Sequence, residues 1–170
     1  VDLNAHFPQC LTFLRNKLRG YAQEHFDVTI MDTPPTAGTF VLNALYASDF
    51  VIVPIDAGSP NSIGGVRKAL GLISTVQRSG RPDLRFLGLL LNRVDPQRSI
   101  TRMIIQEIKE RFTQEKKFQT ILPFSNLVPA AEHKKKTVFD EDAESKAARS
   151  YGALAEELLS LCKADLNESV

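Results

Sequence analysis

A carboxylate directly after an apolar run is the feature of this sequence that could do chemistry most directly. Residues 28–31 read Val-Thr-Ile-Met and predict a short buried strand, which ends at Asp32 because two prolines follow closely. In nucleotide hydrolases, an acid at such a strand end holds the hydration shell of Mg²⁺ beside the phosphates. The alternative is that Asp32 only caps the turn that the prolines make. We expect Asp32 at the carboxyl end of a central parallel strand, facing open space.

Polar residues also follow three other apolar runs, at residues 50–55, 86–91 and 119–122. These runs are continuous rather than alternating, which is typical of parallel strands buried on both faces. Ligands bind at the carboxyl ends of the strands in such sheets. The sequence therefore makes Asn92 and the segment at residues 123–126 candidates for ligand contacts.

Helical periodicity fills the intervals between these predicted strands. The predicted helices cover residues 8–24, 40–47, 63–76, 99–112 and 145–162. Their alternation with strands predicts an α/β fold, a doubly wound and mostly parallel sheet with helices on both faces. A length of 170 residues fits one domain. We expect that domain to span residues 1–163, followed by a polar tail at residues 164–170.

The notable basic run is Lys134-Lys135-Lys136, which lies close to the acidic run at residues 140–142. The net charge is only +1, so a local patch rather than a global field would have to attract DNA. The candidate DNA-binding residues are Lys134, Lys135, Lys136, Arg98, Arg102 and Arg149. The alternative is a solvated loop. No aromatic residue interleaves the three lysines, which argues against a platform for stacking bases.

Composition excludes several other classes of protein. Hydrophobic residues make up 43% and charged residues 24% of the chain, and no apolar run is long enough to span a membrane. No basic and apolar leader opens the sequence, so we expect no signal peptide. Cys10 and Cys162 show no metal-ligand spacing and favour a reducing compartment, so we expect a cytoplasmic protein. The three histidines are dispersed, which argues against a histidine metal site.

Five blocks of the sequence, in the same order and spacing, resemble the ParA/MinD-type deviant P-loop ATPases that partition plasmids and chromosomes. The first is FDVTIMDTPPTAGTFVLNALYASDFVIVPI, which is similar to the family's strand, D-x-P-P, N-A-L helix, A-S-D and apolar strand ending in proline. Gly65 falls where the family has a glycine in the next helix, and FLGLLLNRVDP matches its N-R variant at Asn92-Arg93. The last two are LPFSNLVPAAEHKKKTVFD, which aligns without a gap from Pro123 to Val138, and ESKAARSYGALAEELL. The resemblance covers residues 20–162.

The sequence also departs from the family pattern. It contains no K-G-G-x-G-K-[ST] run, the loop whose backbone N–H groups cradle phosphate, and Gly64-Gly65 is no substitute for it. The family's early D-P-Q switch acid is absent as well, because Asp95-Pro96-Gln97 follows the wrong strand. In the block that starts at Pro123, the departures are Phe124 for Arg, Ala130 for Glu and Lys135 for Gly. Contacts that those positions make in the family are not expected to carry over unchanged.

The resemblance implies ATP and Mg²⁺ as cofactors, a nucleotide-dependent homodimer, non-specific DNA binding and a ParB-like partner protein. It assigns Asp32 to the Mg²⁺ shell through water. It assigns the adenine contacts to Asn92, Arg93, Pro123, Phe124 and Asn126. Because the phosphate loop is missing, we expect this chain alone to bind ATP weakly or not at all and not to hydrolyse it.

Two alternatives to a ParA-like ATPase remain open at the level of sequence: a non-catalytic interaction module and a MinD-like ATPase. The chain is either part of a ParA-like ATPase, which a first residue of Val favours, or a non-catalytic interaction module that is complete as it stands. A MinD-like ATPase of the membrane surface would end in a basic amphipathic helix, a pattern that residues 164–170 lack, so we expect no membrane binding. Without the P-loop strand, the strand at residues 28–31 would have an exposed edge. We therefore expect a rearranged or self-associated sheet, or a parent protein with further N-terminal residues.

Overall fold

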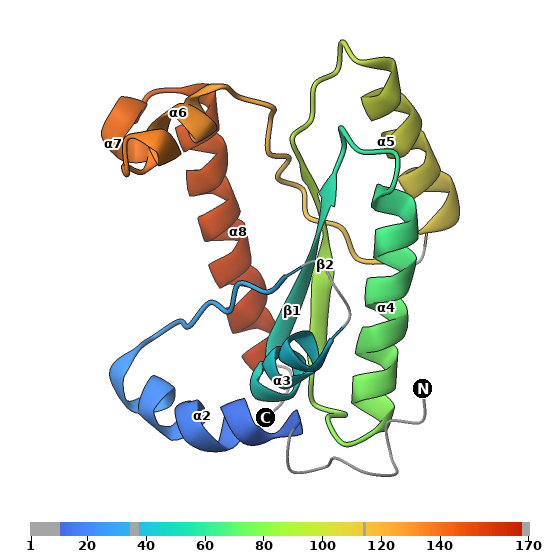
Figure 1. Cartoon of the computed structure of the whole chain (residues 1–170), viewed down its shortest axis with the longest axis vertical. Coiled ribbons are helices and arrows are strands. Elements are labelled where there is room, and N and C mark those ends of the chain that lie inside the picture. The colour runs from blue at the N-terminus through green and yellow to red at the C-terminus, as the bar shows by residue number, and fades with distance from the viewer. Residues whose placement is uncertain (1–10, 35–37, 114, 168–170) are drawn as a thin grey trace. The chain divides into compact units, whose positions relative to one another are not determined.

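The computed structural model describes residues 11–34, 38–113 and 115–167 (Figure 1). The chain divides into two units. Unit 1 comprises residues 1–51 and 67–86, and unit 2 comprises residues 52–66 and 87–170. Strands β1 and β2 and helix α4 contribute residues to both units.

The two central apolar runs form neighbouring parallel strands. Strand β1 spans Phe50–Asp56 and strand β2 spans Arg85–Asn92, and the two are hydrogen-bonded to each other. In unit 1 the N–H of Arg85 donates to the carbonyl of Asp49, and in unit 2 the N–H of Ala57 donates to the carbonyl of Asn92, both at 2.9 Å. Both strand predictions and their parallel direction are confirmed. The interior of β2 is buried from residue 87 to residue 90, whereas in β1 only Val53 and Ile55 are buried and Pro54 is exposed.

A third segment of unit 2 pairs with β2, but the strand predicted at residues 119–122 is wrong. Isolated parallel bridges join Leu89 to Lys117 and Val94 to Pro123, on either side of that range. Between the bridges, the N–H groups of Gln119 and Thr120 donate to the carboxylate of Glu157 in α8, at 2.7 and 2.8 Å. Glu157 therefore holds these two donors where the pairing is interrupted, and pairing with β2 resumes at Leu122, whose N–H donates to the carbonyl of Leu91 at 3.0 Å.

Gly88 allows the third segment to approach β2 closely. Its φ is +153°, and a Cβ at this position would lie 3.1 Å from the carbonyl oxygen of Lys116. Leu89 donates to the same carbonyl, at 2.9 Å. A glycine inside a strand marks such a close backbone approach, and any larger residue here would push the third segment away.

The predicted long helices are present, with shifted ends. They are α2 (Phe13–His25), α3 (Thr39–Ala47), α4 (Ser62–Arg78), α5 (Ser99–Arg111) and α8 (Lys146–Asn167). Residues 8–10 of the first predicted helix lie outside the described residues. Ile104 and Ile108 of α5 are buried. In unit 2, α5 and α8 lie on opposite sides of the strands, so helices cover both faces (Figure 1).

Two short helices were not predicted. Helix α6 spans Leu127–His133 and α7 spans Val138–Asp142. Helix α7 begins with a capping box in which the Thr137 hydroxyl accepts from the N–H of Asp140 and the Asp140 carboxylate accepts from the N–H of Thr137. Both helices pack with α8 around a small apolar cluster formed by Ala131, Val138 and Ala148.

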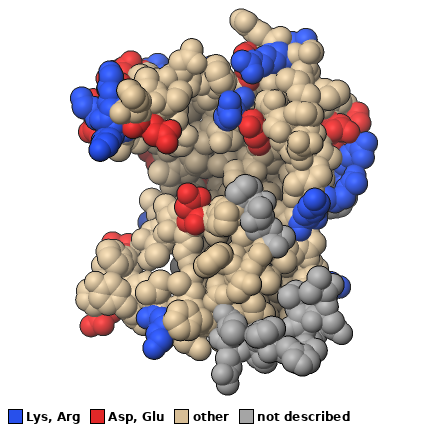
Figure 2. All heavy atoms as spheres, in the orientation of Figure 1, with Lys and Arg blue, Asp and Glu red and all other residues tan. Residues whose placement is uncertain are grey.

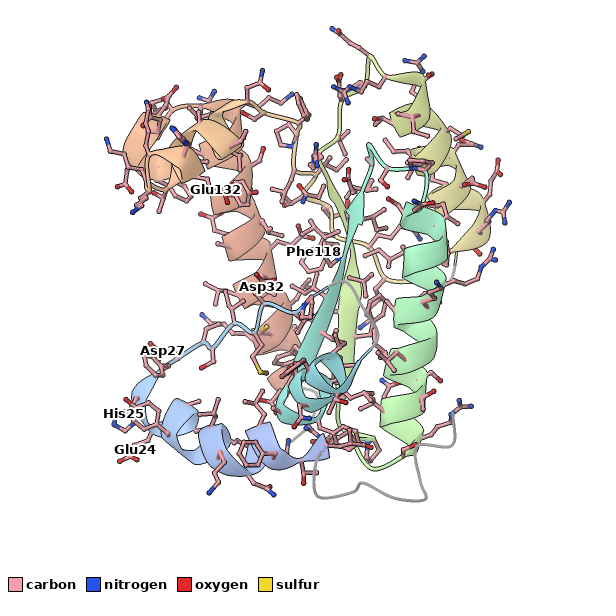
Figure 3. All side chains as sticks on the ribbon, viewed as in Figure 1. Glu24, His25, Asp27, Asp32, Phe118 and Glu132 are labelled. Carbon is pink, nitrogen blue, oxygen red and sulfur yellow. The ribbon has the colours of Figure 1, made fainter. Side chains whose placement is uncertain are left out.

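The strand predicted at residues 28–31 is not formed. Residues 26–34 run as an irregular segment, and no hydrogen bond joins residues 27–34 to any other part of the chain that the structure describes. Val28 and Ile30 are 52% and 81% exposed. A strand exists only when a neighbour supplies backbone partners, and no described segment does so here. Figure 3 shows Asp32 on this segment.

Unit 1 contains a buried arginine that the sequence did not single out. Arg81 is 5% exposed, and its guanidinium donates to the carbonyls of Tyr46 and Ser48 at the end of α3. The same group makes two hydrogen bonds to the Asp83 carboxylate, at 2.8 and 3.0 Å. These bonds lower the pKa of Asp83 below its ordinary value. Arg81 therefore ties the end of α3 to the turn after α4.

Candidate functional site

The carboxyl ends of the strands meet in unit 2, at one edge of the sheet. Asp56 is the last residue of β1 and Asn92 the last residue of β2, and Phe124 follows the bridge at Pro123. The N–H of Phe124 donates to the carbonyl of Val94 at 2.9 Å. The structure thus brings together four of the five residues predicted to contact adenine, Asn92, Arg93, Pro123 and Phe124. The fifth, Asn126, is the exposed N-cap residue of α6.

The turn after β2 holds Asn92 and Arg93 in a defined conformation. Arg93 has a φ of 56°, in the left-handed region that residues other than glycine seldom adopt. The N–H of Arg93 donates to Oδ1 of Asn92 at 2.8 Å, which stabilises this turn. Within the described residues, no acceptor contacts Nδ2 of Asn92. The amide therefore keeps a donor that could reach a ring nitrogen of a base.

Asp56 is a member of this edge that the sequence analysis did not name as a site residue. Its Oδ1 accepts from the N–H of Gly58 at 2.8 Å, and its Oδ2 lies 3.4 Å from Nη1 of Arg93. The side chains of Asp56 and Arg93 are 37% and 57% exposed. Because solvent screens it, this ion pair orients Arg93 more than it stabilises the fold. The sequence could have revealed Asp56 as a site residue, because it directly follows the strand predicted at residues 50–55.

Phe124 brings predicted nucleotide and DNA residues to one place. The guanidinium carbon of Arg98 lies 4.9 Å from the centre of the Phe124 ring, and that of Arg93 lies 5.9 Å away. Both distances are within the range of a cation–π interaction. Nε of Arg98 also lies 3.2 Å from a carboxylate oxygen of Asp95. Arg98 was predicted to bind DNA and Arg93 to bind nucleotide, but they share one aromatic ring.

The other predicted DNA-binding residues do not form a single patch. Nη1 of Arg102 donates to the carbonyls of Pro96 and Gln97, at 2.8 and 3.0 Å, and so holds the loop before α5. Arg149 lies in α8 and pairs with Glu144 at 3.7 Å. These contacts occupy the two arginine side chains at separate points of unit 2.

The lysine run lies at the end of α6, among acidic residues. Lys134 pairs with Glu141, and its hydrogen bond lowers the pKa of that carboxyl below the ordinary value. Figure 2 shows Lys and Arg side chains beside Asp and Glu over α6 and α7. Lys135 and Lys136 are exposed. They are the members of the run most accessible to a phosphate backbone.

Asp32 belongs to unit 1 and is exposed on the segment at residues 26–34. Across the part of the chain that the structure describes, no group of three His, Cys, Asp or Glu residues could hold a metal ion. Mg²⁺ takes one or two carboxylates, with waters and substrate phosphates as its other ligands. The prediction that Asp32 lies at the carboxyl end of a central parallel strand is wrong, because residues 26–34 have no strand partner among the described residues. An exposed carboxylate can still accept a hydrogen bond from a water of a Mg²⁺ shell, so the metal role of Asp32 stays a prediction.

Comparison with solved structures defines the class of fold. The cobyrinic acid a,c-diamide synthase of Mycobacterium smegmatis, crystallised with ADP and magnesium, matches with a TM-score of 0.73 and 28% identity. The match covers 92% of this chain and 55% of that one. The fold is that of the P-loop ATPases, with helices and parallel strands.

Sequence comparison narrows the class. The family model described as "AAA domain" matches residues 4–86. The chromosome partitioning protein ParA of Myxococcus xanthus is 32% identical over 146 residues, which are 86% of this chain and 50% of that protein. The chromosome-partitioning ATPase Soj of Thermus thermophilus is 31% identical over 148 residues, 87% of this chain and 57% of that protein. The chain belongs to the ParA-type family of partitioning P-loop ATPases, and it spans about half the length of these relatives.

No helix in residues 11–34, 38–113 or 115–167 is both long and apolar enough to cross a membrane.

Proposed function

We propose that this chain is the C-terminal part of a ParA-like partitioning ATPase, which binds ATP with Mg²⁺ and binds DNA non-specifically to segregate a plasmid or chromosome. The observation that carries the proposal is the gathering of Asn92, Arg93, Pro123 and Phe124 at the carboxyl ends of neighbouring parallel segments. Ligands of open α/β sheets bind at that edge. The names of the relatives support the partitioning role.

In this proposal, Asn92 donates a hydrogen bond from Nδ2 to the adenine ring, because its Oδ1 already accepts from Arg93. The turn at Pro123 forms a wall beside the base. The family resemblance, and not the geometry, assigns Asp32 of unit 1 to the Mg²⁺ shell through water. The bound Mg²⁺ would neutralise charge on the phosphates.

The cradle of backbone N–H groups for the phosphates has no counterpart in these 170 residues, because no K-G-G-x-G-K run occurs in them. ATP hydrolysis therefore belongs to a protein that supplies that loop. The present chain contributes the base-binding edge.

The partners follow from the same proposal. The ATPase dimerises around nucleotide, contacts a ParB-like protein and acts in the cytoplasm. DNA binding by this chain should be weak and sensitive to salt, because few lysines are available. With two or three phosphate contacts, the slope of log affinity against log salt would be about −2 to −3.

Photo-crosslinking tests the nucleotide part of the proposal. The 170-residue chain is irradiated with 8-azido-ATP, and the labelled peptides are identified by mass spectrometry. Because the phosphate loop is missing, we expect only weak label, at high concentrations of the reagent, in peptides that contain Asn92 or residues 123–126. Unmodified ATP should compete with this label, and Asn92→Ala should be labelled less still. Asn16→Ala, an exposed asparagine of α2, is the matched control. Equal labelling of both variants, or label outside this edge, would refute the assignment.

A non-catalytic ParA-like interaction module is the second candidate. The same experiment separates the two functions, because a module that has lost nucleotide binding would show no labelling that ATP can compete away.

A further inference from the structure

Two arginines of unit 2 lie over one aromatic ring and point charged groups toward solvent. Arg93 and Arg98 approach Phe124 to 5.9 and 4.9 Å, and their side chains are 57% and 51% exposed. The ring is half-buried, so it offers a fixed surface against which two long side chains can rest. Both guanidinium groups therefore lie within 5.9 Å of the centre of the same ring.

The surrounding contacts hold these groups in place without using all their donors. Arg98 contacts Asp95 through Nε, and Arg93 contacts Asp56 through Nη1. A guanidinium has five N–H donors. Within the described residues, both terminal nitrogens of Arg98 and Nη2 of Arg93 therefore remain available to an anion.

The local charge balance is positive. Arg93, Arg98 and Arg102 carry three positive charges against the two of Asp56 and Asp95. Arg98 is also the N-cap residue of α5, a helix of 13 residues with no acidic residue in its first turn and no side-chain cap. The uncapped amides of this helix add to the positive potential beside Arg98.

We propose that Arg93 and Arg98 form a phosphate-binding site and that Phe124 is its positioning residue. Guanidinium groups bind phosphate oxygens through paired, charge-assisted hydrogen bonds. Phe124 acts through the arginines, because both guanidinium groups rest against its ring. The phosphate belongs either to a nucleotide or to a nucleic-acid backbone. Only that choice of ligand rests on the proposed function.

Titration with inorganic phosphate tests the site by itself. The Nε–H signals of Arg93 and Arg98 are followed by NMR in the arginine-labelled 170-residue chain. We expect both signals to shift with saturation. Phe124→Leu, which keeps the volume but removes the π face, should raise the apparent Kd by roughly 5- to 30-fold, because neither guanidinium then has an aromatic ring to rest on. Phe124→Tyr should bind like the parent chain.

Phe139→Ala removes an aromatic side chain of α7 that is 49% exposed, and is the matched control. Circular dichroism of each variant establishes that it is folded. Unmoved Arg93 and Arg98 signals, or equal affinities for Phe124→Leu and Phe124→Tyr, would overturn the proposal.

Two further titrations identify the source of the phosphate. If a nucleotide is the ligand, ATP should compete with inorganic phosphate, and Phe124→Leu should lower the affinity for ATP. If DNA is the ligand, Phe124→Leu should make the salt slope of duplex binding shallower by about 0.9 for each DNA phosphate that the variant no longer neutralises. Failure of the crosslinking experiment at Asn92 would leave the inorganic phosphate result intact, so the two proposals fail separately.

Discussion

Lys135 occupies a backbone conformation that glycine adopts at far lower cost. It follows α6 with a φ of 56°. The N–H of Lys135 donates to the carbonyl of Glu132 and that of Lys136 to the carbonyl of Ala131, both at 2.9 Å. These two bonds are those of a Schellman motif, whose left-handed residue is usually glycine. The family pattern also has glycine at this position, so Lys135→Gly restores the residue that the geometry favours.

The size of the effect can be worked out from two opposing terms. The left-handed conformation costs a residue with a Cβ about 1–2 kcal/mol. Glycine loses about 0.5–1 kcal/mol of this advantage, because its unfolded chain is more flexible. Lys135→Gly should therefore stabilise the α6–α8 region by about 1 kcal/mol. Lys136→Gly is the control, because Lys136 does not have a positive φ, and it should destabilise by about 0.5–1 kcal/mol.

Urea unfolding followed by far-ultraviolet circular dichroism measures both changes, since the chain has no tryptophan. A gain of about 1 kcal/mol moves the midpoint up by roughly 0.3–1 M at ordinary m-values. Hydrogen exchange of the Lys135 and Lys136 amides shows whether the gain lies in this motif, because both amides should exchange more slowly in Lys135→Gly. A Lys135→Gly chain that is no more stable than the parent, or that gains no more than Lys136→Gly, would refute the reasoning.

Four further changes test other parts of the structure. Gly88→Ala should destabilise by about 2–3 kcal/mol in urea unfolding, since a Cβ would lie 3.1 Å from the Lys116 carbonyl; an unchanged midpoint would mean that the third segment yields freely. Partial burial raises the pKa of Glu157, but hydrogen bonds from the Thr120 side chain and from two amides outweigh it and lower the pKa below 4.5. Its contribution is therefore present above pH 4.5 and lost as the pH falls through the folded pKa. Glu157→Gln should cost about 1–2 kcal/mol at pH 7 and less in acid, and a difference independent of pH would contradict this. Ile30→Lys should reduce self-association in light scattering, because Ile30 is 81% exposed on the unpaired segment at residues 26–34. A monomeric parent chain would show that this segment does not pair with a second chain. Thr101→Val should be neutral or should stabilise by up to about 1 kcal/mol, because the Thr101 hydroxyl is buried and has no hydrogen-bond partner among the described residues. A clear loss of stability would show that the hydroxyl does have a hydrogen-bond partner.

The parts of the fold predicted correctly are those that the local pattern determines. Strands β1 and β2 are continuous apolar runs, and their ends differ from the predicted ones by a single residue. The long helices follow apolar residues at helical spacing. In each helix, the apolar residues whose spacing predicts the helix also form its buried face, so one pattern predicts both the helix and the side of it that packs.

The failed predictions share a dependence on distant residues. Residues 28–31 have the composition of a strand, but no described neighbour pairs with them. The amides of Gln119 and Thr120 bind Glu157, 38 and 37 positions away, instead of a neighbouring strand. The burial of Arg81 was not predicted either, because it depends on hydrogen bonds to carbonyls 33 and 35 positions away. Helix α7 is the exception, because Thr137 and Asp140 have the spacing of a capping box and could have revealed it.

The candidate site shows the same division between local pattern and distant contact. The positions of Asn92 and Phe124 after apolar runs predicted that they would lie at one edge of the sheet, and they do. The sequence could not show that Arg98 would approach the Phe124 ring, because the two residues are joined only through the parallel pairing at Val94 and Pro123. The family pattern has an arginine at the position of Phe124, so comparison with that pattern predicts that a positive charge is lost there. The structure shows that the guanidinium of Arg98 lies 4.9 Å from the centre of the Phe124 ring. A position that is cationic in the family pattern is aromatic here, but a cation still lies at this edge because the ring offers Arg98 a surface on which to rest.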